Sequence, residues 1–126
     1  MAYGSDEIPN RISAKMVDLG KVQKICMVAG MATLIEVPEE IEGIRLGNAG
    51  TLTYFKPENP KNEVTLVLKG SKVLPTNLIL RTKKRKYVFD IVPSKRTHQD
   101  TIEIIGDYGG PSIGSDKAVL LDSSDT

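Results

Sequence analysis

The side chains that could carry chemistry are few in this chain and far apart in the sequence. There is one cysteine, Cys26, and one histidine, His98. A nucleophilic cysteine needs a histidine base and an Asn or Asp to orient that base. Cys26 instead lies in an apolar run, residues 24–28 (KICMV), which predicts a small buried hydrophobic residue. A single cysteine also excludes an intrachain disulfide.

His98 lies in a polar connection, residues 95–100 (KRTHQD). A lone histidine without a second histidine or a cysteine does not form a metal site. Because Asp100 is only two residues away, a hydrogen bond within the loop is favoured over a catalytic dyad. No serine has the G-x-S-x-G setting of a hydrolase nucleophile. The sequence therefore predicts no enzyme activity, no metal ligand and no cofactor site.

Acidic residues surround Pro38 at positions 36, 39, 40 and 42. A calcium loop has Asp and Asn at alternate positions with a glycine between them, and this segment has neither feature. We interpret the segment as a solvated acidic loop. A further hypothesis is that Glu39, Glu40 and Glu42 pair with a basic segment on a neighbouring subunit.

The strongest local charge feature is a run of cations: Arg81, Lys83, Lys84, Arg85 and Lys86. It predicts a turn between two strands, in which solvated charges protect a sheet edge from aggregation. Lys83 to Lys86 are the candidates for contact with an anionic partner or subunit. A nucleic-acid patch is the alternative, but Tyr87 and Phe89 alternate towards the core and so do not form a stacking surface.

A glycine-rich segment follows at residues 106–110 (GDYGG). A phosphate-binding loop has the spacing G-x-x-x-x-G-K-[ST] and a helix after it. Neither is present, so this segment is predicted to be a linker.

Turn signals recur at short intervals along the chain, and short runs rich in β-branched residues lie between them. This pattern is typical of an all-β sandwich or barrel-like domain with about seven to nine short, mostly antiparallel strands. The expected strands are residues 16–19, 22–28, 32–37, 41–46, 51–55, 63–68, 77–81, 87–92 and 101–105.

The alternation of apolar side chains assigns the faces of the last predicted hairpin. Leu78 and Leu80 share one face of its first strand, and Tyr87, Phe89 and Ile91 share one face of its second strand. Both follow the period of two of a half-buried strand. Helix signals are poor: residues 38–42 allow one turn at most.

Bulk properties fit one domain with loose ends. The chain has 126 residues and a net charge of +1, which excludes a global attraction to nucleic acid or an anionic membrane. We expect a flexible leader at 1–15, a β-sandwich domain at 16–106 and a Gly/Ser/Asp-rich linker or tail at 107–126, with a small apolar patch at 118–121. No apolar run approaches the roughly 20 residues of a membrane span, and no secretory signal is visible.

Several blocks of residues resemble a known family. They are residues 28–38 (VAGMATLIEVP), 46–48 (LGN), 76–82 (TNLILRT) and 85–91 (RKYVFDI). With these blocks the chain resembles the N-terminal domain of the TraK-like outer-ring subunits of type IV secretion and conjugation outer-membrane core complexes. The positions that match the family pattern are Gly30, Thr33, Pro38, Gly47, Thr76, Asn77, Leu78, Tyr87 and Phe89.

The resemblance implies a structural role without catalysis or cofactor. It implies a homo-oligomeric ring in the periplasm near the outer membrane, assembled with a lipoprotein and an inner-membrane-anchored channel subunit. The lack of a visible signal would then mean that the sequence is trimmed. The resemblance covers about residues 22–92.

The chain departs from the family pattern at three places. Asn48 stands where the family usually has Asp, residues 54–57 (YFKP) are displaced from the usual aromatic position, and Lys69-Gly70 stands where a Lys-Pro is usual. The N-terminal domain of pilus and type II/III secretins has a similar layout of short strands and is the alternative family. A β-domain that binds nucleic acid or an anionic partner through the basic turn is the alternative function.

Overall fold

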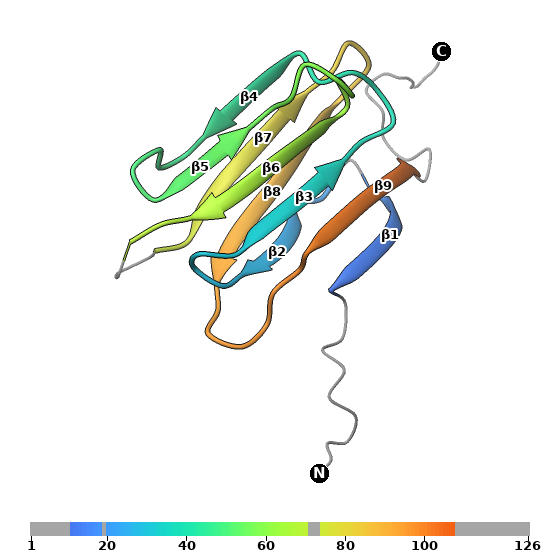
Figure 1. The fold of residues 1–126 in the computed structure, drawn as a ribbon. Coiled ribbons are helices and arrows are strands. Elements are labelled where there is room, and N and C mark those ends of the chain that lie inside the picture. The colour runs from blue at the N-terminus through green and yellow to red at the C-terminus, as the bar shows by residue number, and fades with distance from the viewer. Residues whose placement is uncertain (1–10, 19, 71–73, 108–126) are drawn as a thin grey trace.

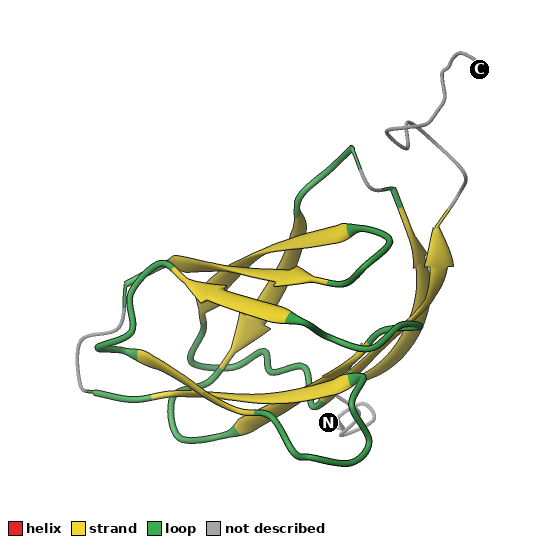
Figure 2. Ribbon diagram, turned by 90° about the horizontal axis from the view of Figure 1, so that it is seen from above, coloured by secondary structure: helices red, strands yellow, loops and turns green. Residues whose placement is uncertain are grey.

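The computed structural model describes residues 11–18, 20–70 and 74–107. In this part of the chain every regular element is a β-strand, as predicted (Figure 2). No helix long and apolar enough to cross a membrane occurs among these residues. The strands are β1 (Ile12–Val17), β2 (Gln23–Met27), β3 (Ala32–Glu36), β4 (Gly43–Leu46), β5 (Leu52–Phe55), β6 (Glu63–Leu68), β7 (Thr76–Arg81), β8 (Lys86–Pro93) and β9 (Thr101–Asp107).

The strands form two sheets that pack face to face as a small β-sandwich (Figure 1). The five-stranded sheet has the order β1-β9-β3-β6-β5, and the four-stranded sheet has the order β2-β8-β7-β4. The β3–β6, β5–β6, β4–β7 and β7–β8 pairs are antiparallel. The β1–β9, β3–β9 and β2–β8 pairs are parallel, so both sheets are mixed.

The core lies between the sheets and is built by alternation along each strand. In β8, Tyr87, Phe89 and Ile91 are buried and the residues between them face outward, as predicted. Leu78 and Leu80 of β7 are buried in the same layer. Full burial of an aliphatic or aromatic side chain contributes roughly 1.5–3 kcal/mol. The other core residues are Val17, Ile25, Met27, Ile35, Val37, Ile41, Leu52, Val64, Leu66, Leu68, Ile102 and Ile104.

The first strand begins earlier than predicted, at Ile12 rather than residue 16. Residues 12–15, which were expected in the leader, pair in parallel with β9, and Ile12 is opposite Thr101. Only Val17 of this strand is buried, so the segment lacks the apolar signal of a half-buried strand. Its position is set by hydrogen bonds to a strand about 90 residues away.

The single helical turn allowed at residues 38–42 does not form. The backbone of this segment is hydrogen-bonded to other strands and loops instead. The N–H of Ile41 donates to the carbonyl of Lys61 (2.9 Å), and the N–H of Glu42 donates to the carbonyl of Arg81 (2.7 Å). The Ile41 side chain is buried between the sheets, and this burial holds the segment where its N–H groups reach these carbonyls.

At the other end of the domain, Gly106 and Asp107 belong to β9 and are in register with Met16 and Val17. The predicted linker at 107–126 therefore begins one residue too early, and the glycine-rich segment at 106–110 shares two residues with the strand, because pairing with β1 extends β9. Residues 1–10 of the expected leader (1–15), the rest of the expected tail and the apolar patch at 118–121 lie outside the described residues.

Candidate functional site

The basic segment is a tight turn between β7 and β8, as predicted. Thr82 is 5% exposed and organises this turn. Its N–H donates to the carbonyl of Arg85 (2.9 Å), and its Oγ1 accepts from the N–H groups of Lys84 (3.2 Å) and Arg85 (3.1 Å). The side-chain hydroxyl thus satisfies backbone groups that the turn would otherwise leave unpaired.

Arg85 differs from the other cations of this segment, because it is held rather than solvated. Its side chain is 20% exposed, its Nε lies 3.0 Å from Glu39 Oε2, and its Nη1 pairs with Asp107 Oδ2. Tyr87 donates its phenol hydrogen to Glu39 Oε1 (2.8 Å). We call Arg85, Glu39, Asp107 and Tyr87 the Arg85 cluster. The expectation of a fully solvated basic turn is wrong at Arg85, since two carboxylates from distant segments converge on it.

The Arg85 cluster joins three segments of the chain: the loop after β3, the β7–β8 turn and the end of β9. Burial and the hydrogen bond to Glu39 raise the pKa of the Tyr87 phenol above its usual range. The phenol therefore remains a hydrogen-bond donor at neutral pH, and the cluster acts as a structural clamp.

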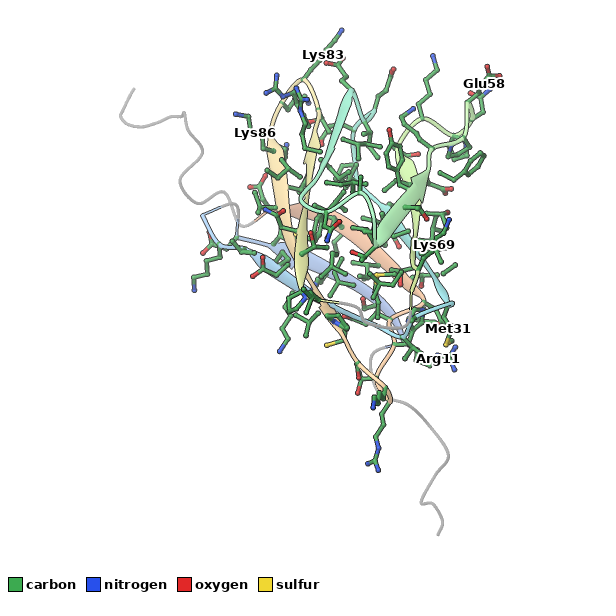
Figure 3. All side chains as sticks on the ribbon, turned by 90° about the vertical axis from the view of Figure 1, so that its left-hand side faces the viewer. Arg11, Met31, Glu58, Lys69, Lys83 and Lys86 are labelled. Carbon is green, nitrogen blue, oxygen red and sulfur yellow. The ribbon has the colours of Figure 1, made fainter. Side chains whose placement is uncertain are left out.

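The predicted acidic loop and basic turn meet within one chain. Besides the Glu39–Arg85 pair, Lys83 Nζ lies 3.9 Å from Glu42 Oε2, although the Lys83 side chain is 85% exposed. Lys83 and Lys86 lie at one end of the sandwich, and Met31 and Arg11 lie at the other (Figure 3). Pairing of this turn with the acidic loop of a neighbouring subunit remains a prediction. The predicted residues left exposed for such a contact are Glu40, Glu42, Lys83, Lys84 and Lys86.

His98 is buried at the end of the sandwich opposite the basic turn, with an exposure of 2%. Its Nδ1 accepts a hydrogen bond from the N–H of Val28 (2.9 Å), so the proton is on Nε2, which donates to the carbonyl of Ala32 (2.7 Å). The predicted hydrogen bond within the loop does not form, because both ring nitrogens bond to backbone atoms of Val28 and Ala32, outside the loop. Asp100 Oδ1 is 3.7 Å from Nε2, too far for a hydrogen bond.

Asp100 is paired with Arg11 instead. Its two carboxylate oxygens accept from Arg11 Nε (3.0 Å) and Nη2 (2.6 Å). The hydrogen bond from Arg11 lowers the pKa of the Asp100 carboxyl below its ordinary value. Both side chains are 36% exposed, so this is a surface ion pair that joins β1 to the start of β9.

The loop that carries His98 covers one edge of the four-stranded sheet. Gln99 donates its N–H to the carbonyl of Cys26 (3.0 Å), and its Oε1 accepts from the N–H of Cys26 (2.9 Å). The Cys26 side chain is only partly buried, contrary to the prediction. Strand alternation places Ile25 and Met27 in the core and directs Cys26 outward.

The structure brings two blocks of the family resemblance together. The N–H of Gly47 donates to the carbonyl of Asn77 (2.9 Å). A Cβ on Gly47 would lie 2.7 Å from Thr76 Oγ1 and closer still to Asn77 Oδ1, so a larger residue here would have to displace these two side chains. The Gly47 and Thr76–Asn77 motifs therefore describe one structural feature.

The remaining motif positions also have structural roles. Gly30 adopts a φ of +88°, a conformation that other residues rarely adopt, in the turn before β3. Thr33 is fully buried and donates from Oγ1 to the carbonyl of Gln99 (2.6 Å). Pro38 is exposed at the start of the acidic loop. The core positions of the motif are Leu78, Tyr87 and Phe89.

Sequence reasoning missed the exposed aromatic residues at the end of β5. Tyr54 is 48% exposed and Phe55 is 65% exposed. Tyr54 lines an open groove of about 430 Å³ between β5 and β4, the edge strands of the two sheets, together with Ile44 and Lys56. The only available signal was that YFKP is displaced from the usual aromatic position of the family.

The described residues contain no group of three or more His, Cys, Asp or Glu side chains arranged to hold a metal ion. The polar side chains with defined partners bind backbone atoms or one another, and the open surfaces are sheet faces and sheet edges. No protein-family model matches this chain, and no curated protein is detectably similar to it.

Proposed function

We propose that this β-sandwich is a non-enzymatic structural module of a bacterial type IV secretion or conjugation envelope complex. It would form part of a homo-oligomeric, periplasmic ring associated with the outer membrane. Its partners would be a lipoprotein and an inner-membrane-anchored channel subunit.

The observation that carries this proposal is the contact of Gly47 with Thr76 and Asn77. These residues belong to separate blocks of the resemblance, yet they are in contact: the N–H of Gly47 donates to the carbonyl of Asn77, and the Thr76 and Asn77 side chains lie against Gly47. This contact supports the interpretation that the shared pattern describes a shared fold rather than a chance match of short strands. The all-β sandwich is also the fold that the resemblance implies.

The use of the polar side chains supports the non-enzymatic part of the proposal. Both ring nitrogens of His98 bind backbone groups, and the Arg85 guanidinium binds two carboxylates. A general base must be able to reach a substrate, and these groups are committed to holding loops. By contrast, the exposed Phe55 and the groove between β4 and β5 offer surface for another protein.

The test is fractionation of cells that make the native protein at its natural level, followed by affinity purification from detergent-solubilised envelopes. We expect recovery with the periplasm or outer membrane, together with a lipoprotein and a channel subunit. An untagged strain treated in the same way is the control. Recovery from the cytoplasm, alone or with nucleic acid, would overturn the proposal.

A further inference from the structure

The outer face of the five-stranded sheet carries three carboxylates in a row. Glu36 of β3 is in register with Glu63 of β6 on one side and with Glu103 of β9 on the other. Adjacent strands lie roughly 4.8 Å apart, and like charges directly opposite each other are destabilising. No described Lys, Arg or His forms an ion pair with these carboxylates. We call Glu36, Glu63 and Glu103 the acidic row.

An apolar strip lies beside the acidic row on the same face. Leu34, two residues before Glu36 on β3, is in register with Thr101, which is in turn in register with Ile12. Ile12 is 82% exposed. An open hollow of about 420 Å³ includes this strip and Glu36 of the acidic row. This face therefore combines exposed apolar surface with unpaired negative charge.

The outer face of the four-stranded sheet has the opposite charge. Arg81 of β7 is directly opposite Lys86 of β8, and Arg45 of β4 lies one pleat away on the same face. We call Arg45, Arg81 and Lys86 the basic cluster. The three side chains and Ile79 line an open hollow of about 440 Å³, to which Glu42, the residue before β4, also contributes. All three cations are exposed, and none forms an ion pair within the described chain.

The two faces are complementary in both charge and polarity. Among the described strands, the outward positions of the five-stranded sheet carry no Lys or Arg. On the four-stranded sheet the outward acid of these strands is Asp90, which is in register with Lys24. Each face thus carries a group of like charges next to apolar residues, and the two groups have opposite sign.

We propose that the outer face of the four-stranded sheet binds the outer face of the five-stranded sheet of a second copy of this chain. The basic cluster lies over the acidic row of the second copy, and Ile79 packs against its Leu34 and Ile12. The pairing removes two like-charge repulsions at once and covers the apolar strip.

This contact is head-to-tail, because the two surfaces differ and face in opposite directions from the two layers of the sandwich (Figure 1). Lys86 projects from the outer side of the β7–β8 layer (Figure 3). Head-to-tail contacts close into rings or extend into filaments. The inference rests on the proposed function, a ring of identical subunits, and names the surfaces through which that ring would form.

The three cations and Glu103 are exposed and Glu36 and Glu63 are half-buried, so the contact should be weak and sensitive to salt. Exposed charges separated by more than a Debye length, about 8 Å at physiological ionic strength, are largely screened. We therefore expect the purified chain to self-associate at 20 mM NaCl and to be largely monomeric at 500 mM NaCl. A full ring would gain its stability from many such contacts made at once.

The test is sedimentation velocity of the full 126-residue chain and of charge-reversed variants at both salt concentrations. Glu36→Lys with Glu63→Lys makes both faces basic, and Arg81→Glu with Lys86→Glu makes both faces acidic. Each double variant should weaken self-association at 20 mM NaCl by about tenfold or more, since like charges then meet across the contact. The quadruple variant, with both faces reversed, should self-associate again.

The equimolar mixture of the two double variants should also associate, because each then presents a face complementary to the other. Melting temperatures of all variants verify that each chain is folded. Lys83→Glu with Lys84→Glu is the matched control: it makes the same charge change as the Arg81/Lys86 variant but at the turn rather than on the sheet face. A contact through the sheet faces leaves self-association of this control unchanged, whereas the competing pairing of the turn with the acidic loop of a neighbouring subunit would make the control lose it.

Several outcomes would overturn the inference. The first is a wild-type chain that stays monomeric at 20 mM NaCl up to 1 mM protein, a concentration on the order of the effective concentration within a tethered assembly. The second is a quadruple variant that does not recover self-association. The third is loss of self-association only in the Lys83/Lys84 control. Salt-dependent binding of a single-stranded 20-nucleotide DNA to a chain that does not self-associate would instead assign the basic cluster to nucleic acid.

The inference and the proposed function fail separately. Self-association through these faces in a protein recovered from the cytoplasm would leave the contact standing and overturn the envelope function. Recovery in an envelope complex that assembles equally well with the charge-reversed variants would overturn the contact and leave the function standing.

Discussion

At one end of the sandwich Arg85 is held by the carboxylates of Glu39 and Asp107, whereas at the other end His98 is held by the backbone of Val28 and Ala32. Both side chains fasten a loop to the sheets. The charged cluster is 15–20% exposed at its ion-paired groups, so water reaches it, while His98 is 2% exposed. A buried neutral network that satisfies backbone groups should therefore be more sensitive to truncation than a charged cluster that water partly reaches.

The largest expected effect is that of His98→Ala. It leaves the N–H of Val28 and the carbonyl of Ala32 without partners. An unsatisfied buried group costs about 1–3 kcal/mol, and since both groups are only partly buried we expect a total loss of about 3 kcal/mol, in the lower half of the range for two groups. Urea unfolding followed by circular dichroism measures it. His98→Asn, whose Oδ1 can replace Nδ1 as the acceptor for Val28, should lose less. A His98→Ala variant within about 0.5 kcal/mol of wild type would contradict this account of the loop.

The next effect is that of Arg85→Met, which removes the cation that pairs with both Glu39 and Asp107. Breaking a fully buried pair costs 3–5 kcal/mol, and partial exposure reduces our expectation to about 2 kcal/mol. Lys83→Met is the matched control. It removes a cation from the same turn, but its partner is 3.9 Å away and the side chain is 85% exposed, so a change of less than about 0.5 kcal/mol is expected. Equal losses in the two variants would mean that the cluster is no more than surface charge.

Tyr87→Phe tests a single hydrogen bond of the same cluster. Loss of the phenol that donates to Glu39 should reduce stability by about 1 kcal/mol at pH 7. The pKa of this phenol is raised in the folded protein, so above the ordinary value of 10.0 the unfolded chain ionises first. The advantage of wild type over Tyr87→Phe is therefore present below pH 10 and should shrink as pH rises beyond it. Unfolding curves from pH 8 to 11 measure the free energy of unfolding of both proteins. A difference between them that does not change with pH would contradict the hydrogen bond from the Tyr87 phenol to Glu39.

The smallest effect is that of Asp100→Asn, because the Arg11–Asp100 pair is exposed. The pKa of Asp100 is lowered in the folded state, so its contribution is present above the ordinary carboxyl value of 3.8 and is lost as pH falls through the lowered value. Thermal unfolding from pH 6 to pH 2.5 should show wild type and Asp100→Asn converging in acid. A stability difference between wild type and Asp100→Asn that grows as the pH falls would contradict a lowered pKa of Asp100 in the folded state.

Local sequence pattern was enough to predict most of the strands. Period-two alternation located the residues of β6, β7 and β8 that face the core, and turn residues separated them. The same signal failed for β1, whose side chains are mostly exposed. It also failed for Cys26, because its neighbours Ile25 and Met27 face the core and Cys26 faces outward. Alternation of apolar and polar residues identifies the inward face of a strand only if one face of that strand is buried and the other is exposed.

The sites depend on which strands become neighbours, and local pattern carries no information on that. Glu39, Arg85 and Asp107 are separated by 46 and 22 residues, and their meeting required the end of β9 to lie beside the β7–β8 turn. The acidic row likewise exists because β9 and β6 flank β3. Each glutamate alone was an ordinary outward residue of a strand.

The sequence by itself determined the all-β class, the inward face of the central strands and the turn at Thr82, because these follow from alternation and from short-range hydrogen bonding. Only the tertiary structure decided that Arg85 is clamped, that His98 supports backbone, and that the two outer faces have opposite charge. Those properties arise from pairings between residues distant in the chain, and the free energy of such pairings depends on the whole sandwich rather than on any one segment.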